Sequence, residues 1–213
     1  LALFAALLVL SFTPVAAHWN PQQDPSKWVQ EPDLTTNGID INATQDYILA
    51  DDFLCQEEGA ITGIHLWASW YHDEYPLNSP SAVAFTLSIH KDIPDSLSGT
   101  GYSMPGELLW QMSFSAGNFT VQPWAEQIAE GWMDPPESYE FPADWTCWQY
   151  NFAIPAEVAF LQEGTSQEPR VYWLDVQAVP MESGHLFGWK TTDSNWNDDA
   201  VYGSGQEPYT GPW

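Results

Sequence analysis

The chain has 213 residues, of which 29 are Asp or Glu and 4 are Lys or Arg, so its formal charge at pH 7 is −25. Nucleic acids and anionic membrane surfaces are bound through basic patches, and this charge argues against both classes of partner. Hydrophobic residues make up 44% of the chain and aromatic residues 15%, which excludes a disordered chain and provides for one folded domain.

Residues 1–17 are predicted to be an export signal. The first ten residues are apolar and uncharged, and the small residues Val15, Ala16 and Ala17 match a cleavage site before His18. The apolar stretch is shorter than the roughly 20 residues of a membrane-spanning helix. We therefore expect a protein that is secreted or held at the cell surface, without membrane insertion of the mature domain. Neither an initiator Met nor a basic segment precedes Leu1, and the sequence stops at Trp213 without a terminal signal, so we expect it to be truncated at both ends.

Residues 18–45 are rich in proline and contain few apolar residues besides Trp19 and Trp28, which predicts an extended lead-in. From there on, apolar residues recur with a period of two, as in half-buried strands. The clearest predicted strands cover residues 60–70, 83–90, 108–114, 148–154 and 172–178. Weaker strand patterns cover residues 47–54, 119–122, 186–190 and 200–202.

Many short strands, separated by turns that use many of the 17 prolines and 14 glycines, predict an all-β fold with little helix. We expect residues 46–213 to form a two-sheet antiparallel β-sandwich resembling a jelly roll, with a closed barrel as the alternative. Short helical turns are expected only at residues 123–129 and 155–162.

The chain has two cysteines, Cys55 and Cys147. An even number of cysteines in an exported protein favours a disulfide, and two buried free thiols are the alternative. There is no CxxC motif or cluster of Cys and His that would indicate a zinc site.

Several segments together resemble a family of uncharacterised secreted bacterial proteins. They are KWVQ at 27–30, LADDFLC at 49–55, IHLWASW at 64–70, GYSMPGE at 101–107, CWQYNF at 147–152, VYWLDV at 171–176 and FGWK at 187–190. The resemblance implies export and a β-rich domain, and it assigns no activity and no catalytic residue.

The segment between residues 193 and 199 has oxygen-bearing side chains at closely spaced positions, as in calcium-binding loops. It lacks the turn glycine and the bidentate Glu of an EF-hand. We predict a calcium site formed by this loop alone or together with a strand, from Asp51, Asp52, Asp193, Asn195, Asn197, Asp198 and Asp199. The alternative is that these side chains only stabilise turns through hydrogen bonds to the backbone.

The chain contains 13 Trp, 9 Tyr and 10 Phe. Aromatic rings are suited to stacking on sugar rings, so a polysaccharide or a cell-surface glycan is the expected partner. Trp67, on the polar face of its strand, and Trp132 and Trp196, in expected loops, are the candidate ligand-binding residues. The alternative is that these rings pack in the core.

No catalytic residue is assigned. A glycoside hydrolase requires two carboxylates about 5 to 10 Å apart, and only Glu107 and Asp175 lie in strongly apolar surroundings. The sequence therefore favours a non-catalytic, cation-stabilised module that binds carbohydrate or acts in adhesion. A passive structural component of the surface or matrix, and a secreted glycoside hydrolase, are the alternatives.

The calcium hypothesis leads to a direct prediction. If the folded chain binds calcium, millimolar calcium raises the melting temperature relative to excess chelator, because the ion binds the folded state alone. Tryptophan fluorescence at fixed ionic strength measures the melt, and an identical melting temperature in both buffers would contradict the hypothesis.

Overall fold

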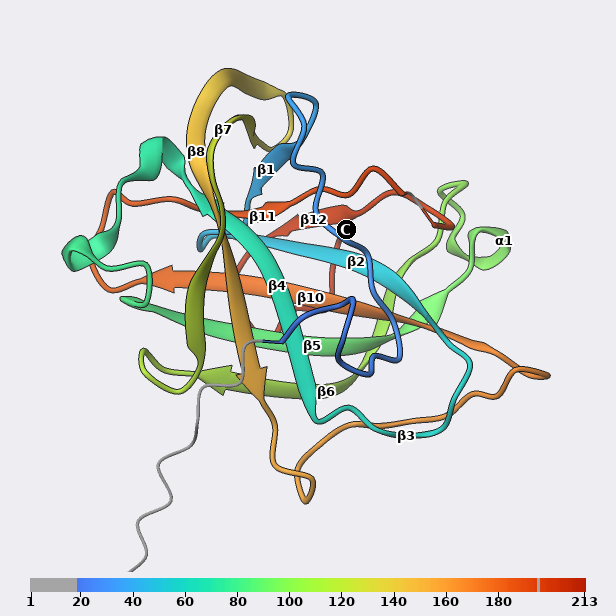
Figure 1. Ribbon diagram of the computed structural model, residues 1–213. Coiled ribbons are helices and arrows are strands. Elements are labelled where there is room, and N and C mark those ends of the chain that lie inside the picture. Colours follow the sequence, from blue (N-terminus) through green and yellow to red (C-terminus); the bar gives the residue numbers. More distant parts are fainter. Residues whose placement is uncertain (1–18, 195) are drawn as a thin grey trace, which may run out of the picture.

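The computed structural model describes residues 19–194 and 196–213 (Figure 1). Over these residues the chain is mostly strand, and two main sheets pack against each other, which confirms the predicted all-β sandwich. In this described part, no helix is long and apolar enough to cross a lipid bilayer. The predicted export signal lies outside the described residues.

The first sheet has five antiparallel strands. In spatial order they are β12 (Val201–Ser204), β2 (Tyr47–Cys55), β10 (Arg170–Pro180), β5 (Val83–Ile93) and β6 (Met104–Phe114). Strands β2, β5 and β10 carry the alternating apolar residues that predicted them, and these residues face the second sheet.

The second sheet closes on itself as a small barrel. Its spatial order is β1 (Ile39–Asn42), β11 (Phe187–Lys190), β4 (Gly63–Trp70), β8 (Ser138–Ala153) and β7 (Thr120–Asp134). Strand β1 runs parallel to β7, and this pairing closes the barrel. The sandwich and the barrel, which the sequence presented as alternatives, are thus combined in one molecule.

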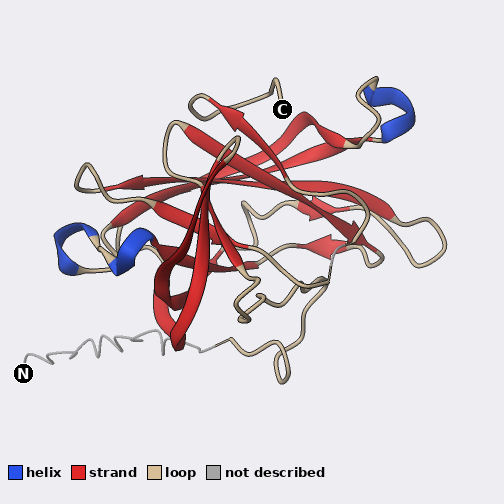
Figure 2. Ribbon diagram, turned by 90° about the horizontal axis from the view of Figure 1, so that it is seen from above, coloured by secondary structure: helices blue, strands red, loops and turns tan. Residues whose placement is uncertain are grey.

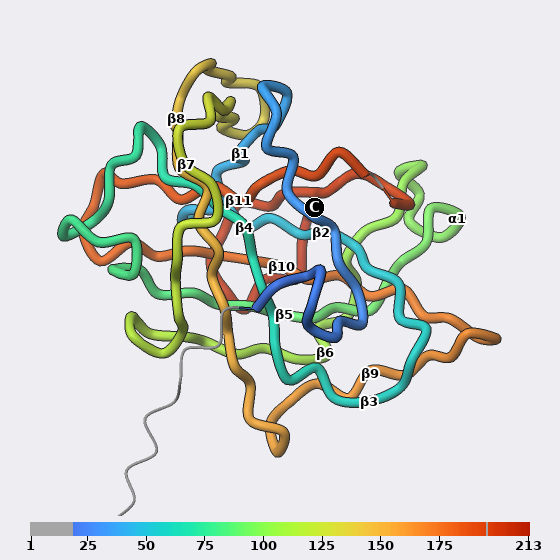
Figure 3. Tube along the Cα trace, in the orientation of Figure 1, coloured from blue at the N-terminus to red at the C-terminus, as the bar shows by residue number. Residues whose placement is uncertain are grey.

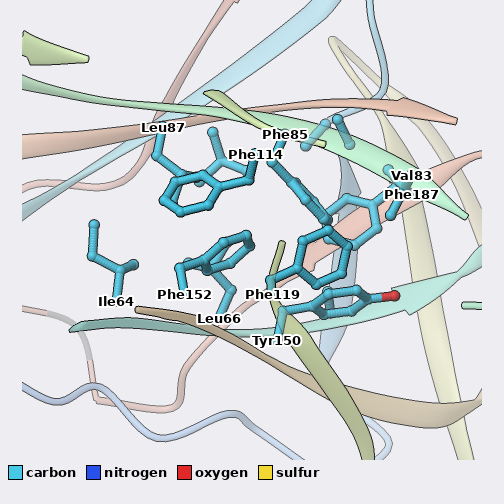
Figure 4. Packing of buried hydrophobic residues seen from close by; sticks show 14 of the residues in the cluster. Ile64, Leu66, Val83, Phe85, Leu87, Phe114, Phe119, Tyr150, Phe152 and Phe187 are labelled. Atoms are coloured by element: carbon cyan, nitrogen blue, oxygen red, sulfur yellow. The ribbon is translucent and has the colours of Figure 1, made fainter. Parts of the chain in front are cut away.

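The two sheets cross at a steep angle, as Figure 1 shows for β4 over β5 and β10. Aromatic side chains fill the space between them (Figure 4). Phe85 and Phe114 of the first sheet meet Phe152 of the second, with ring centroids 5.2 and 4.9 Å apart. Each such buried ring contributes about 1.5–3 kcal/mol to the free energy of unfolding.

Helical structure is short and does not lie where the sequence predicted it. Residues 123–129 belong to β7, whose pairing with β8 shifts register there, so bulges obscure the period of two. Residues 155–162 form turns and the short strand β9 (Leu161–Gln162), which pairs with β3 (Gly59–Ala60). Helical turns at opposite ends of the molecule (Figure 2) comprise α1 (Asp95–Ser98), η1 (Tyr71–Asp73) and η2 (Pro76–Asn78).

One further expectation is corrected. The predicted disulfide is wrong, because Cys55 and Cys147 are both buried free thiols, one at the end of β2 and the other in β8. Residues 39–42 of the lead-in form β1 of the barrel.

Gly188 lies where the barrel has no room for a side chain. A Cβ atom at this position would lie 2.5 Å from the Trp132 ring and 2.8 Å from the Cβ of Asp40. We predict that Gly188→Ala lowers the free energy of unfolding by about 1–3 kcal/mol, because Trp132 and β1 must shift. Urea unfolding measures the change. Gly63→Ala, where the nearest contact would be an ordinary 3.4 Å, is the control, and equal stability of the two variants would contradict the packing argument.

Candidate functional site

A cavity of about 1440 Å³, here called the central cavity, lies between the lead-in and the two sheets. Its apolar lining includes Leu49 and Leu174 from the first sheet and Phe152 from the second. Trp19 and Trp28 of the lead-in line it from the other side. Figure 3 shows the lead-in passing in front of β4 and β5 before it rises to β1. The lead-in therefore forms one wall of the cavity.

Tryptophan rings cluster around the central cavity. Trp19 stacks on His65, with ring centroids 4.1 Å apart and an interplanar angle of 7°. Trp67 lies beside both Trp19 and Trp124, at centroid distances of 6.0 and 5.5 Å. Trp67 lines the cavity but is only 6% exposed, because the lead-in covers the face of β4 that the sequence suggested was open.

The other two predicted ligand-binding tryptophans differ from each other. Trp196 is half-buried, and its ring meets the ring of Trp28 edge to face at 5.1 Å, so it lies next to the cavity wall. Trp132 lies in β7, not in a loop, and is 2% exposed. Its Nε1 donates a hydrogen bond to Asp134 Oδ1 at 3.1 Å. Trp132 is therefore a packing residue of the barrel, which corrects its assignment as a ligand-binding platform.

Polar groups of the central cavity are suited to hydrogen bonding. His65 Nδ1 lies 2.6 Å from Asn151 Oδ1. Burial lowers the pKa of His65, so the ring is neutral at pH 7, and donation from Nδ1 to the amide oxygen leaves Nε2 as an acceptor. Asp51 also lines the cavity, and burial together with repulsion from Asp199 raises its pKa to about 6. The cavity thus combines aromatic rings with hydrogen-bond acceptors.

The predicted calcium residues divide between two faces of β2. Asp51 and Asp52 are consecutive in a strand, so their side chains leave opposite faces. Asp199 is close enough to Asp51 to raise its pKa, and both residues line the central cavity. Asn197 donates from Nδ2 to Asp52 Oδ2. The loop therefore does reach β2.

On the face of β2 that carries Asp52, hydrogen bonds from Ser103 hold the loop at residues 193–199 in place. Asp198 Oδ2 accepts hydrogen bonds from the backbone N–H and the hydroxyl of Ser103, at 2.7 and 2.6 Å, and these lower the pKa of Asp198. Burial raises the pKa of Asp52 to about 7, and its Oδ1 is buried without a hydrogen-bond partner among the described residues. Asp193 is exposed, and Asn195 lies outside the described residues. Calcium binding here stays a prediction.

The two carboxylates considered for hydrolysis do not face each other. Glu107 is exposed on β6, whereas Asp175 is fully buried on the outer face of the first sheet. There, Asp175 Oδ2 lies 2.7 Å from His90 Nε2, and His90 Nδ1 donates to the carbonyl oxygen of Gly106 at 3.1 Å. The C-terminal segment covers this pair, with the Trp213 ring 5.8 Å from His90. This is a buried ion pair under the chain terminus.

Sequence reasoning missed a group of charged residues inside the barrel: Asp40, Glu130, Asp144 and Lys190. The sequence does mark two of these residues as unusual. Asp40 stands between two isoleucines of a strand, and Lys190 is one of only 4 basic residues in the chain. A charged residue within a short apolar strand indicates a buried ionic partner.

The buried His90 pair predicts how stability depends on pH. Burial lowers the pKa of His90, but the hydrogen bond and charge of Asp175 outweigh it, so the pKa is raised. Burial, with Asp175 nearby, raises the pKa of Glu207 from 4.5 to about 7. The folded chain therefore binds more protons than the unfolded chain above about pH 4.5, and stability falls as pH rises toward 7 and beyond.

Glu207→Gln, which resembles the protonated side chain, should make this decline shallower between pH 4.5 and 7. The exposed Glu168→Gln is the matched control and should keep the slope of the unaltered chain. Urea unfolding across this pH range, in chelator, measures both slopes. An unaltered slope in Glu207→Gln would show that Glu207 is not protonated in the fold.

The sequence model of one protein family, described as a domain of unknown function (DUF7901), matches residues 26–213. No curated protein and no solved structure matches the chain. The match begins within the lead-in and extends over both sheets and the C-terminal segment, so it includes Trp28 of the cavity wall but not Trp19. It supports the expected relation to an uncharacterised family, while export and a bacterial origin stay predictions. The chain belongs to the DUF7901 family.

Proposed function

We propose that this domain is an exported, non-catalytic module that binds carbohydrate in the central cavity. The observation that carries the proposal is the lining of the cavity, where Trp19, Trp28 and Trp67 lie together with His65, Asn151 and Asp51. Sugar rings present apolar C–H faces and hydroxyl edges. Aromatic rings match the former, and carboxylate, amide and imidazole acceptors match the latter.

The size and charge of the central cavity restrict the kinds of sugar that it can bind. Small-molecule pockets have volumes of roughly 300–1,000 Å³, and about 1440 Å³ provides room for an oligosaccharide of more than one ring. Asp51 and Asp199 both line the cavity, and the chain carries a formal charge of −25. Repulsion then disfavours uronate and sulfated sugars, so we expect neutral glycans to bind better than acidic ones.

One observation favours hydrolysis as a second candidate function. Asp51 and Asp199 form a pair of carboxylates on the central cavity, and the pKa of Asp51 is raised to about 6. A raised pKa in one of two carboxylates is what a glycosidase requires of its general acid. Release of reducing sugar from a bound glycan, lost in Asp51→Asn, would distinguish hydrolysis from binding alone.

The binding proposal predicts the effect of removing one cavity ring. Trp28→Ala should weaken binding of a neutral oligosaccharide about tenfold or more, because a contact worth about 1.4 kcal/mol or more is lost. Trp145→Ala is the control, since Trp145 is an exposed residue of β8 outside the cavity lining. Isothermal titration against a panel of neutral and acidic glycans measures the affinity, and melting curves establish that both variants fold.

Equal weakening by the two substitutions would place the binding site elsewhere. Failure of the unaltered chain to bind any glycan of the panel would overturn the proposal and leave a passive structural role.

A further inference from the structure

Four charged side chains meet in the interior of the barrel, on four different strands. Asp40 of β1 is paired in register with Lys190 of β11, and Glu130 of β7 with Asp144 of β8. The side chains of Asp40, Glu130 and Lys190 are 0% exposed, and Asp144 is fully buried as a residue. No substrate reaches these groups in the folded state, so the cluster is not a catalytic site.

The ammonium group of Lys190 binds two of the three carboxylates in this cluster, those of Asp40 and Glu130. Its Nζ donates to Asp40 Oδ2 at 2.7 Å and pairs with Glu130 Oε1. The hydroxyl of Ser69 donates to Glu130 Oε2 at 3.4 Å. Both carboxylate oxygens of Asp144 and Oδ1 of Asp40 have no hydrogen-bond donor among the residues that the structure describes. The unsatisfied groups are all oxygen acceptors.

The spacing and the charge of the three carboxylates both indicate that the missing partner is a cation. One oxygen each from Asp40, Glu130 and Asp144 lies within 4.8 Å of the other two. Two oxygens bound to one calcium ion at roughly 2.3–2.6 Å are separated by at most about 5 Å, so a single ion can bind all three. Three carboxylates and one ammonium leave a net charge of −2, which is costly inside a protein, and a divalent cation neutralises it.

We propose that the barrel interior is a structural site for a hard divalent cation of the calcium or magnesium class, bound by Asp40, Glu130 and Asp144. Lys190 pairs with Asp40 and Glu130, and Ser69 donates to Glu130, so these two ligands are held in place. The three carboxylates belong neither to the loop at residues 193–199 nor to the lining of the central cavity, although Lys190 does line that cavity. Because its ligands come from β1, β7 and β8, the ion joins the first strand of the barrel to the two long ones.

A proton competes with the proposed cation for these carboxylates. Burial and repulsion from Asp40 raise the pKa of Asp144 to about 9, and the same causes raise that of Glu130 to about 7. A proton held between Asp144 and Glu130 removes one negative charge but leaves a charge of −1 and supplies only one donor. A cation instead displaces the proton, so its affinity must fall as the pH is lowered.

The test uses the full chain with the predicted loop site disabled by Asp193→Asn, Asp198→Asn and Asp199→Asn together. Metal content after gel filtration, and melting temperature with calcium, magnesium or manganese against excess chelator, are measured on this protein. We expect one equivalent of bound metal and a rise of several degrees with one of the ions. Adding Asp144→Asn to this protein should abolish both the bound metal and the rise in melting temperature.

Two results would overturn the proposal. One is the absence of bound metal and of any cation-dependent shift in the loop variant. The other is an Asp144→Asn protein that matches or exceeds the stability of its parent in chelator and in metal alike, because Asn then replaces a protonated Asp without loss. If Asp144→Asn does not fold, the metal content and melting shift of the loop variant decide the question alone.

Discussion

The ion pair between Lys190 and its two carboxylates connects the charge of this chain to its fold. Of the 4 basic residues, Lys27, Lys91 and Arg170 are exposed, and Lys190 is the one placed inside the barrel. Asp40, Glu130 and Lys190 come from β1, β7 and β11, so the pairing can form only when the barrel has closed. Breaking one partner of a buried pair leaves an uncompensated charge and typically costs about 3–5 kcal/mol. In this strongly acidic chain, the buried ammonium group of Lys190 thus links three strands of the closed barrel.

Strand pattern predicted the architecture well where one face of a strand meets the aromatic core. Strands β4, β5 and β10 alternate cleanly, because Leu66, Phe85 and Val176 pack between the sheets. Strand β7 was missed over residues 123–129 because its bulges interrupt the period of two. Strand β1 was missed because four residues with Asp40 in the middle do not form a visible apolar pattern.

The candidate site was harder to predict, for one physical reason. Alternating apolar and polar residues show that a strand has two different faces. They do not show whether the polar face is open to solvent or covered by another segment. In this fold the lead-in covers the outer face of β4, and the C-terminal segment covers that of β5 and β10. Trp67 and His90 are buried for that reason, although Trp67 was expected to be open to a ligand. Asn197 of the loop contacts Asp52, an arrangement that the sequence left open beside a loop acting alone, and calcium binding there stays a prediction. The central cavity depends on how the sheets cross, which no local pattern encodes.

The lead-in has two mechanical roles, since it forms a wall of the central cavity and ends in β1 of the barrel. Strand β1 pairs on one side with β7 and on the other with β11. Without it, both neighbours would present unpaired backbone N–H and C=O groups, the kind of strand edge that templates aggregation. The smallest piece of this chain that can remain soluble as a closed barrel therefore begins before Ile39, and a domain cut at residue 46, where the sequence pattern places the sandwich, would create two adhesive edges.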